Sequence, residues 1–288
     1  MLHTDDSTLE VRPPLLRIVE LDHVLPHEEH DLQRSQPLMR RIEASGIWLH
    51  PPLVAPLPDI ENKYVVLDGA NRCHSLKHLG YPHILVQVVD YESGQVKLDT
   101  WNHVISELPF ASMLPLIKAL PNVEVQESDI LTARATLARR EALAYVVEIA
   151  SRTAYILTTP DLSLKARNRH LIDLVDCYRQ AGKLDRLNSH DPGLVRQMFP
   201  TSTALIVFPH YEPAEIMVAA RDQILLPPGI SRHIIQGRAM RLNYPLEALR
   251  DPHLSIVEKN TALEKWMIGK ISQRAVRFYA ESTYLFDE

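Results

Sequence analysis

Hydrophobic positions in the first hundred residues fall into short runs typical of strands and into spacings typical of helices. The β-branched and apolar runs predict strands at Leu15–Val19, Lys63–Leu67, Ile84–Tyr91 and Val96–Val104. Near-helical spacing followed by a glycine predicts helices at Asp31–Ser45 and Asn71–Leu79. We therefore expect a loose N-terminus at residues 1–14 and a compact α/β domain over residues 15–108.

The pattern changes after Pro109, where a second region is expected. Short apolar runs predict strands at Val123–Val125, Arg134–Leu137, Ala144–Ile149, Ala154–Leu157, Ala204–Phe208 and Ala239–Tyr244. Amphipathic spacing predicts helices at Leu162–Leu187 and Pro213–Arg221, and Leu225–Ile235 is expected to be a Pro/Gly loop. The expected fold class is α/β (α+β), with residues 109–288 forming a second α/β domain that closes a cleft over the first.

Composition narrows the class of protein. The 288 residues have 45% hydrophobic and 23% charged positions and a net charge of −5, the balance of a globular protein without the basic surplus of a DNA-binding one. Two cysteines give no disulfide framework or CxxC pair. The first residues lack a signal-peptide pattern, and no apolar run approaches the roughly 20 residues of a membrane span. We expect a cytoplasmic protein; its oligomeric state is not predicted.

The segment Tyr64–Gly80 carries the first candidate site. A strand runs into Asp68-Gly69, and a helix starts at once. The free N–H groups and the dipole of a helix N-terminus favour an anion, and Gly69 allows close approach of a ligand. Arg72 adds a permanent charge that can bind phosphate through two hydrogen bonds. The alternative is ordinary structure, because Asp is a common N-cap and Gly a common turn residue.

Two further groups contain candidate chemistry. In His27-Glu28-Glu29-His30 one glutamate is a candidate general base, although acidic residues also cap helices. The two histidines are three residues apart, not four, which argues against a zincin-type zinc site. Arg232-His233 follows a Pro/Gly loop and can pair with a carboxylate or phosphate, although a surface Arg beside a half-buried His is the more ordinary interpretation.

These pieces, in this order, resemble a known family. His27-Glu28 through Gly46, then Asp68-Gly-x-x-Arg72, then Val88–Tyr91 and Thr100-Trp101 resemble the free serine kinases of ParB/sulfiredoxin fold. That family includes archaeal ADP-dependent enzymes and bacterial ATP-using enzymes of siderophore precursor pathways. The later Ser231-Arg-His233 resembles the Thr/Ser-Arg-His element of the same proteins. The similarity covers residues 15–105 well and 225–250 more thinly.

The resemblance implies a kinase that transfers a phosphoryl group from ATP or ADP, with Mg²⁺, to free L-serine. Glu28 matches the catalytic base and Asp68 the second essential carboxylate, a possible Mg²⁺ ligand. The positions that match phosphate- or nucleotide-binding residues are Gly69, Ala70, Asn71, Arg72 and His74. The positions that match substrate-binding residues are Trp101, Ser231, Arg232 and His233.

The chain departs from the family pattern at two positions of the phosphate loop. The family often has Asp-Gly-His-His-Arg, whereas this chain has Ala70 and Asn71 in place of the two histidines. Sulfiredoxin chemistry would need a cysteine where Ala70 stands, and Cys73 lies beyond the arginine. The alternatives are a ParB-like DNA-binding transcriptional regulator and a non-catalytic sensor of nucleotide or serine.

Overall fold

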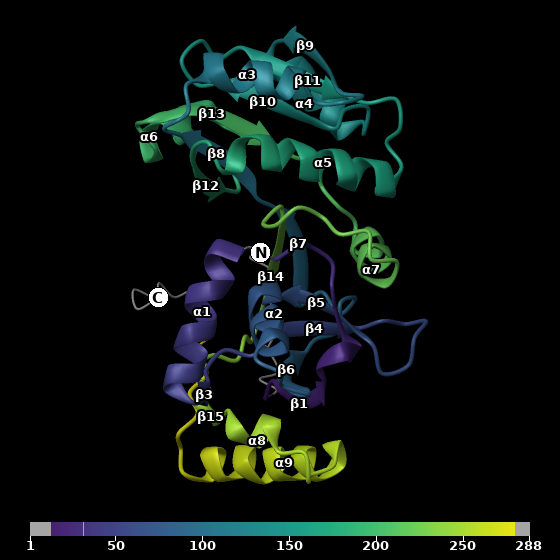
Figure 1. The fold of residues 1–288 in the computed structure, drawn as a ribbon, viewed down its shortest axis with the longest axis vertical. Helices are drawn as coiled ribbons and strands as arrows, with labels where there is room; N and C mark the ends of the chain where they lie inside the picture. Colours follow the sequence, from purple (N-terminus) through teal and green to yellow (C-terminus); the bar gives the residue numbers. More distant parts are fainter. Residues whose placement is uncertain (1–12, 31, 280–288) are drawn as a thin grey trace, which may run out of the picture.

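The computed structural model describes residues 13–30 and 32–279, which form two main β-sheets with helices around them (Figure 1). The lower sheet in Figure 1 has the strand order β1-β6-β4-β5-β2. Its strands are β1 (Leu15–Glu20), β2 (Val24–Pro26), β4 (Leu53–Pro56), β5 (Tyr64–Asp68) and β6 (His83–Val88). The pairs β2–β5 and β4–β6 are parallel, and the other two pairs are antiparallel. We call this sheet with its helices the lower unit.

The upper sheet is antiparallel throughout and has the order β12-β8-β13-β10-β11-β9. Its strands are β8 (Asn102–Ser106), β9 (Glu124–Ser128), β10 (Ala144–Glu148), β11 (Ala154–Thr158), β12 (Lys183–Leu187) and β13 (Ser202–Val207). The accompanying helices are α3 (Phe110–Lys118), α4 (Ile130–Ala138), α5 (Leu164–Arg179) and α6 (Pro192–Met198). We call this sheet with these helices the upper unit.

A two-stranded ribbon connects the units in Figure 1. It pairs β7 (Val96–Thr100) with β14 (Ser231–Ile235), so segments far apart in the sequence run side by side. Helix α7 (Pro213–Arg221) lies beside the ribbon and leads into the loop before β14. One hydrophobic core extends across both sheets and includes Leu53 and Val65 from below and Ile105 and Ala144 from above.

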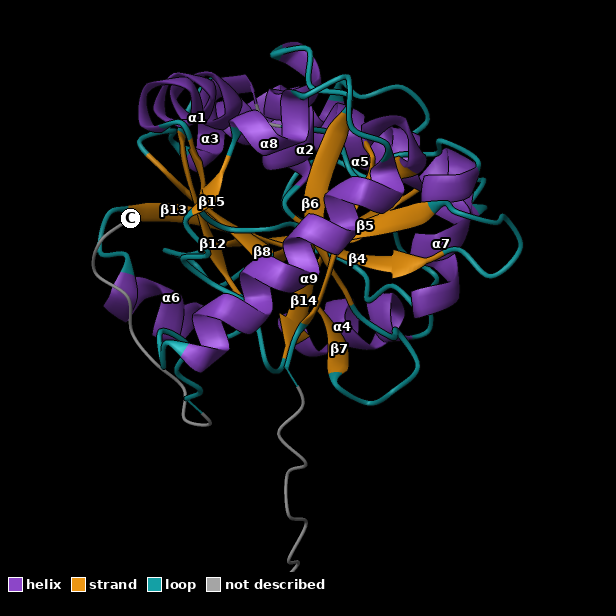
Figure 2. Cartoon of the chain, turned by 90° about the horizontal axis from the view of Figure 1, so that it is seen from below, coloured by secondary structure: helices purple, strands orange, loops and turns teal. Residues whose placement is uncertain are grey.

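The C-terminal part of the chain packs on the lower unit, not on the upper one. There β3 (Ile47–Trp48) pairs with β15 (Tyr244–Pro245), followed by α8 (Glu247–Arg250) and α9 (Ile256–Ser272). Helix α9 crosses in front of the lower sheet in Figure 2, which is seen from below. On α9, Oδ1 of Asn260 accepts a hydrogen bond from the Ile18 N–H (2.9 Å), and Nδ2 of Asn260 donates to the Ile18 carbonyl (2.8 Å). These bonds attach α9 to the edge strand β1.

The two helices predicted in the first domain are present as α1 (Leu32–Ser45) and α2 (Ala70–His78). Asp31 and residues 1–12 of the expected loose N-terminus lie outside the described residues. The expected division at residue 108 remains a prediction, but β8 already belongs to the upper sheet, and α9 returns to the lower unit. We propose that the chain enters the upper unit at Asn102 and leaves it after β13, since α7 contacts β2 and β5 of the lower sheet.

Several predicted elements were wrong. Val96–Val104 is not one strand, because the chain turns at Trp101, whose N–H donates to the Ile230 carbonyl (2.8 Å). Arg134–Leu137 is helical within α4, where Asp129 caps the N-terminus by accepting from the Thr132 N–H (2.9 Å). The alternating pattern on both sides of Trp101 contains no local signal for the break in the strand, since its partner Ile230 lies far along the chain.

Two other predictions failed at a glycine and at a Pro/Gly loop. The helix expected over Leu162–Leu187 ends at Arg179, and after Gly182 the chain forms β12. The strand expected at Ala239–Tyr244 is absent, and the strand is Ser231–Ile235, which pairs with β7. Both errors arise because pairing with a distant strand decided the local conformation. No described helix is both long and apolar enough to cross a membrane.

Candidate active site

The two candidate carboxylates lie at one edge of the lower sheet. Strands β2 and β5 are parallel neighbours, with Pro26 opposite Val66. His27 and Glu28 follow β2 directly, and Asp68 ends β5. Because the carboxyl ends of parallel strands meet at the same edge of a sheet, Glu28 and Asp68 are brought together although a helix and two strands separate them in the sequence.

Glu28 is held by the loop that precedes β14. Its Oε2 accepts the Gly229 N–H (2.7 Å) and its Oε1 accepts the Ser231 hydroxyl (3.1 Å). Backbone hydrogen bonds join the same two segments. The Leu226 N–H donates to the His27 carbonyl (2.9 Å), and the Glu29 N–H donates to the Leu226 carbonyl (2.8 Å). A loop from the distant C-terminal part of the chain therefore fixes the position of the candidate base.

The His27 ring contacts both strand β5 and Ser231. The side chain is buried, with Nδ1 2.5 Å from the Val66 carbonyl and Nε2 2.7 Å from the Ser231 hydroxyl oxygen. A carbonyl only accepts, so we assign a proton to Nδ1. The Ser231 hydroxyl, which donates to Glu28 Oε1, thus also lies within hydrogen-bond distance of His27. The expected substrate-binding role of Ser231 remains a prediction, and the structure places its hydroxyl on the candidate base.

Asp68 is surrounded by cations. The Arg72 Nη2 lies 2.6 Å from its Oδ2, and Arg238 from the loop after β14 forms a second short ion pair with the same oxygen. Burial opposes ionisation of Asp68, but the two guanidinium groups outweigh it and lower the pKa of this carboxyl. Sequence patterns gave no signal for Arg238, because it stands alone and far along the chain from its partner.

The phosphate loop has the expected strand–turn–helix geometry. Gly69 is the N-cap of α2 with φ of +106°, a conformation that favours glycine. A Cβ there would lie 2.8 Å from Arg72 Nη2 and 2.9 Å from the Cβ of Pro52, so a side chain does not fit. Ala70 and Asn71 open the helix, and the first-turn N–H groups lie where the sequence predicts an anion site, which remains a prediction.

His74 lies on the same helix, one turn further along. Its ring stacks on that of His30 with centroids 3.6 Å apart and planes 11° from parallel, and His78 follows at 6.3 Å. Burial, with smaller contributions from the two neighbouring histidines, lowers the pKa of His74. The stack brings His30 from the start of the first-helix segment beside the phosphate loop, and the predicted nucleotide-binding role of His74 stays a prediction.

Strand β14 places its side chains on alternate faces. Ser231 and His233 point toward His27, and the His233 ring meets the His27 ring edge-on at 5.4 Å. Arg232 points the other way, with Cζ 4.2 Å above the Trp101 ring and Nη1 3.6 Å from Asp99 Oδ2. The predicted pair Arg232-His233 therefore does not face one ligand from the same side of the strand.

The environments of these two side chains differ as well. The His233 Nε2 lies 2.7 Å from the Tyr91 hydroxyl, and burial, followed by the charge of His27, lowers the pKa of His233 to about 3. His233 is thus neutral at ordinary pH. Arg232 stays charged, and its Nη1 is buried without a hydrogen bond to any described group. Of the two, Arg232 is the better candidate to bind an anionic ligand.

No protein-only metal site is present among the described residues, since no three Asp, Glu, His or Cys side chains there could hold a metal. Asp68 is the carboxylate at the phosphate loop. Mg²⁺ is commonly bound by one or two carboxylates together with substrate phosphates. The residues present therefore fit a Mg²⁺ ion that arrives with a nucleotide, with Asp68 as the protein ligand.

Several known proteins are similar to this chain in sequence. No family model matches the sequence. The chain is 25% identical to the ATP-dependent L-serine kinase SbnI of Staphylococcus aureus, over 95% of this chain and 97% of that protein. It is 39% identical to an ATP-dependent L-serine kinase of Staphylothermus marinus over 84 residues, which span only 33% of that protein. A shorter segment, 18% of this chain and 27% of the relative, is 38% identical to a ParB-like protein of Sulfolobus acidocaldarius.

Solved structures share the fold. SbnI of Staphylococcus aureus with a C-terminal truncation matches with a TM-score of 0.71 at 22% identity, over 89% of this chain and 97% of that one. A free serine kinase in complex with AMP matches with a TM-score of 0.71 at 20% identity, over 83% and 95%. The expected α/β fold is thereby confirmed. The chain is therefore similar to L-serine kinases in sequence over nearly its full length, and it shares the fold of solved serine kinases.

Proposed function

We propose that this chain is a free L-serine kinase that makes O-phospho-L-serine. The observation that carries the proposal is the placement of Glu28 and the Asp68–Arg72 phosphate loop at one sheet edge. This agrees with the full-length similarity to a protein named as an L-serine kinase. Phosphoryl transfer requires mainly the positioning of two substrates and stabilisation of charge, and this arrangement provides both.

In the proposed reaction, Glu28 accepts the proton of the serine hydroxyl while the serine oxygen forms a bond to the terminal phosphorus of the nucleotide. The bond between that phosphorus and its bridging oxygen breaks, and the shortened nucleotide leaves. Oε1 and Oε2 of Glu28 each accept one hydrogen bond from the protein, and each keeps a lone pair for the incoming proton. The base is therefore fixed in direction without being blocked.

The nucleotide phosphates bind, in this proposal, to the first turn of α2 and to Arg72. The Arg72 Nε is buried and makes no hydrogen bond to a described group, which leaves a donor for a phosphate oxygen. Mg²⁺ bound with the nucleotide neutralises phosphate charge, and Asp68 is its proposed protein ligand. The imidazoles of His30 and His74 lie beside this loop, where the two histidines usual at positions 70 and 71 are missing.

Substrate serine is proposed to bind near Trp101 and Arg232. The charged Arg232, stacked on Trp101, binds either the serine carboxylate or the transferred phosphate. His233 is proposed to contact the substrate only as a neutral ring, given its lowered pKa. Free serine, nucleotide and Mg²⁺ occur together in the cytoplasm, which fits the location predicted from the sequence.

The decisive experiment is a product assay. The protein is incubated with L-serine, MgCl₂ and either ATP or ADP, and O-phosphoserine is measured by mass spectrometry, with D-serine and L-threonine as controls. We expect O-phosphoserine from L-serine with at least one nucleotide, and the two arms identify the donor. Absence of product with both nucleotides would contradict the proposal. Binding without turnover would then favour a sensor, and salt-dependent DNA binding a regulator.

A further inference from the structure

A chain of buried hydrogen bonds leads from the upper unit to the residue that holds Glu28. His103 on β8 is fully buried, with Nδ1 2.7 Å from the Tyr178 hydroxyl on α5. Its Nε2 lies 3.3 Å from the carbonyl of Gly229. Neither His103 nor Tyr178 belongs to the motifs that identified the candidate site, and Tyr178 lies outside the two segments whose motifs resembled the family in the sequence.

The direction of these hydrogen bonds follows from the groups involved. The Gly229 carbonyl can only accept, so the proton of the imidazole lies on Nε2. Burial, and then the charge of Arg186, lowers the pKa of His103 to about 3, so the ring is neutral and Nδ1 is an acceptor. Burial raises the pKa of Tyr178, so its hydroxyl keeps its proton and donates. Tyr178 thus selects the His103 tautomer that donates to Gly229.

Gly229 is held tightly between the two units. Its N–H donates to Glu28 Oε2 and its carbonyl accepts from His103, so one residue connects the base to the upper core. Its φ is +79°, and the Arg186 guanidinium occupies the space where a Cβ would stand. The backbone of Gly229 therefore has little freedom to rotate while these contacts persist.

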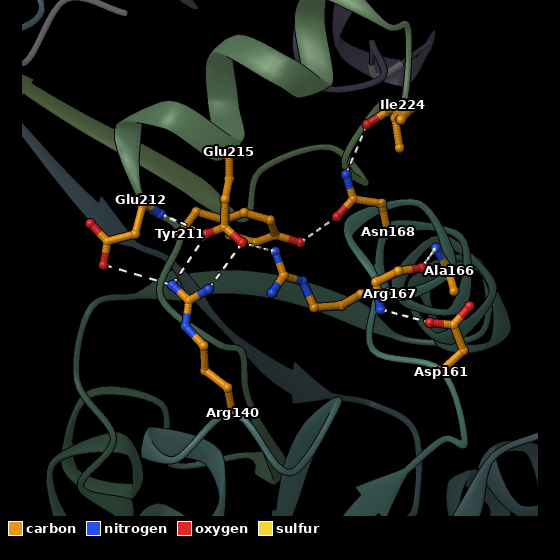
Figure 3. A network of polar contacts seen from close by, with 10 residues as sticks. Arg140, Asp161, Ala166, Arg167, Asn168, Tyr211, Glu212, Glu215 and Ile224 are labelled. Carbon is orange, nitrogen blue, oxygen red and sulfur yellow. Dashed lines mark hydrogen bonds and ion pairs between the residues drawn. The ribbon is translucent and has the colours of Figure 1, made fainter.

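Helix α5 anchors the same loop at its other end (Figure 3). The Asn168 amide donates to the Ile224 carbonyl (2.8 Å), and the Tyr211 hydroxyl donates to Asn168 Oδ1 (2.7 Å). Asn168 and Tyr178 are ten residues apart, about 15 Å along the helix. One rigid helix thus supports residues 224–229 at both ends, directly at Ile224 and through His103 at Gly229.

We propose that His103, oriented by Tyr178, is a positioning residue that fixes Gly229 so that its N–H aligns the Glu28 carboxylate. This inference rests on the proposed kinase function with Glu28 as the base. Removing the His103 donor leaves the carbonyl of Gly229 unsatisfied, so the Gly229–Ile230 peptide can turn, and the Gly229 Cα that also carries the N–H to Glu28 loses its anchor. A displacement of the base by about 1 Å is enough to slow turnover about 100-fold, without removing any group that binds substrate.

The test compares His103→Gln, His103→Leu, Tyr178→Phe and Tyr145→Phe in the phosphoserine assay. Glutamine keeps an N–H donor near the position of Nε2, whereas leucine does not. Tyr145 is the matched control, because its hydroxyl is buried in the same unit and has no hydrogen-bond partner among the described residues. Unfolding curves for each variant establish that the protein assayed is folded.

We expect His103→Leu to lower kcat about 10- to 100-fold with the KM for nucleotide within about twofold. His103→Gln should recover most of kcat, Tyr178→Phe should lose a few-fold, and Tyr145→Phe should lose nothing measurable. In a Glu28→Gln background, His103→Leu should cause no further loss, because both act through one group.

Equal kcat for His103→Leu and His103→Gln, or a full additional loss in the Glu28→Gln background, would overturn the inference. If His103→Leu does not fold, equal kcat for Tyr178→Phe and Tyr145→Phe overturns it. A wild-type protein without phosphoserine product rejects the kinase proposal itself, which is a different outcome from an active wild type whose His103 variants do not differ.

Discussion

Glu28 and Asp68 leave the same edge of the lower sheet from neighbouring parallel strands, but different kinds of groups hold them. Glu28 accepts hydrogen bonds from a backbone N–H and a hydroxyl, both neutral donors. Asp68 forms ion pairs with Arg72 and Arg238. Both residues are carboxylates, so the sequence does not distinguish their surroundings. The partners that the folded chain brings to each carboxylate do.

This difference separates their proposed roles. A carboxylate between two guanidinium groups stays ionised, since protonation would forfeit both ion pairs, and it acts through its fixed charge. A carboxylate held by neutral donors keeps its direction and can still take a proton. Their position at one sheet edge therefore brings both carboxylates to the candidate site. The contacts from β14 and its flanking loops distinguish the roles proposed for Glu28 and Asp68.

The largest effect should follow from Glu28→Gln, which keeps the shape and removes the base. We expect kcat to fall about 10³-fold while nucleotide affinity changes less than twofold. Glu29→Gln is the matched control: Glu29 is adjacent, and burial, followed by the charge of Asp176, raises its pKa. If Glu29→Gln were the more damaging change in a phosphoserine assay, the base would be misassigned and the comparison would fail.

A smaller loss, spread over binding and turnover, should follow from Asp68→Asn. Without its charge the side chain no longer holds Arg72 and Arg238, so we expect kcat/KM to fall about 10²-fold with a raised KM for nucleotide. Arg238→Ala removes one of the two ion pairs and should cost less than tenfold. Titration of nucleotide binding beside steady-state kinetics separates the two effects, and an unchanged KM in Asp68→Asn would contradict the role given to this carboxylate.

The smallest effect concerns stability in acid. The arginines outweigh burial and lower the folded-state pKa of Asp68, so its ion pairs contribute fully above the ordinary value of 3.8. The contribution disappears as the pH falls through the lowered folded value. Since 40% of the side chain is exposed, water screens it, and we expect about 1 kcal/mol at most.

Urea unfolding of the wild type and Asp68→Asn between pH 2.5 and 6 measures this contribution. The difference in free energy of unfolding should be constant near pH 6 and shrink toward zero at the acid end. A difference that grew on acidification would mean that the ion pairs do not stabilise the fold.

Much of the lower unit was predictable because its signals are local. A β-branched strand followed by Asp68-Gly69 and a helix ending before Gly80 predicted the strand–turn–helix of the proposed phosphate loop, and the structure has that geometry with Gly69 at positive φ. Strand β1 and helix α7 also lie where hydrophobic spacing placed them. Short-range propensities and distant contacts agree at these positions, so a pattern within a few residues suffices.

The errors cluster where a distant partner decides the conformation. The break at Trp101 depends on Ile230, and β12 forms because β8 is available to pair with Lys183–Leu187. Arg238 and His103 escaped notice for the same reason. A single arginine or a buried histidine has no spacing that marks it, and each acquires its role only from the atoms that folding brings beside it.

The sequence alone determined the α/β class, the strand–turn–helix around Gly69 and Asp68 as a candidate. Those features depend on residues within one strand, turn and helix, whose stereochemistry is local. Glu28 was selected among the glutamates only through the family resemblance. Tertiary structure alone decided which carboxylate faces cations, that Ser231 lies on the base, and that Gly229 connects it to His103. Those contacts join segments that are far apart in the sequence, and their geometry exists only once both sheets have packed.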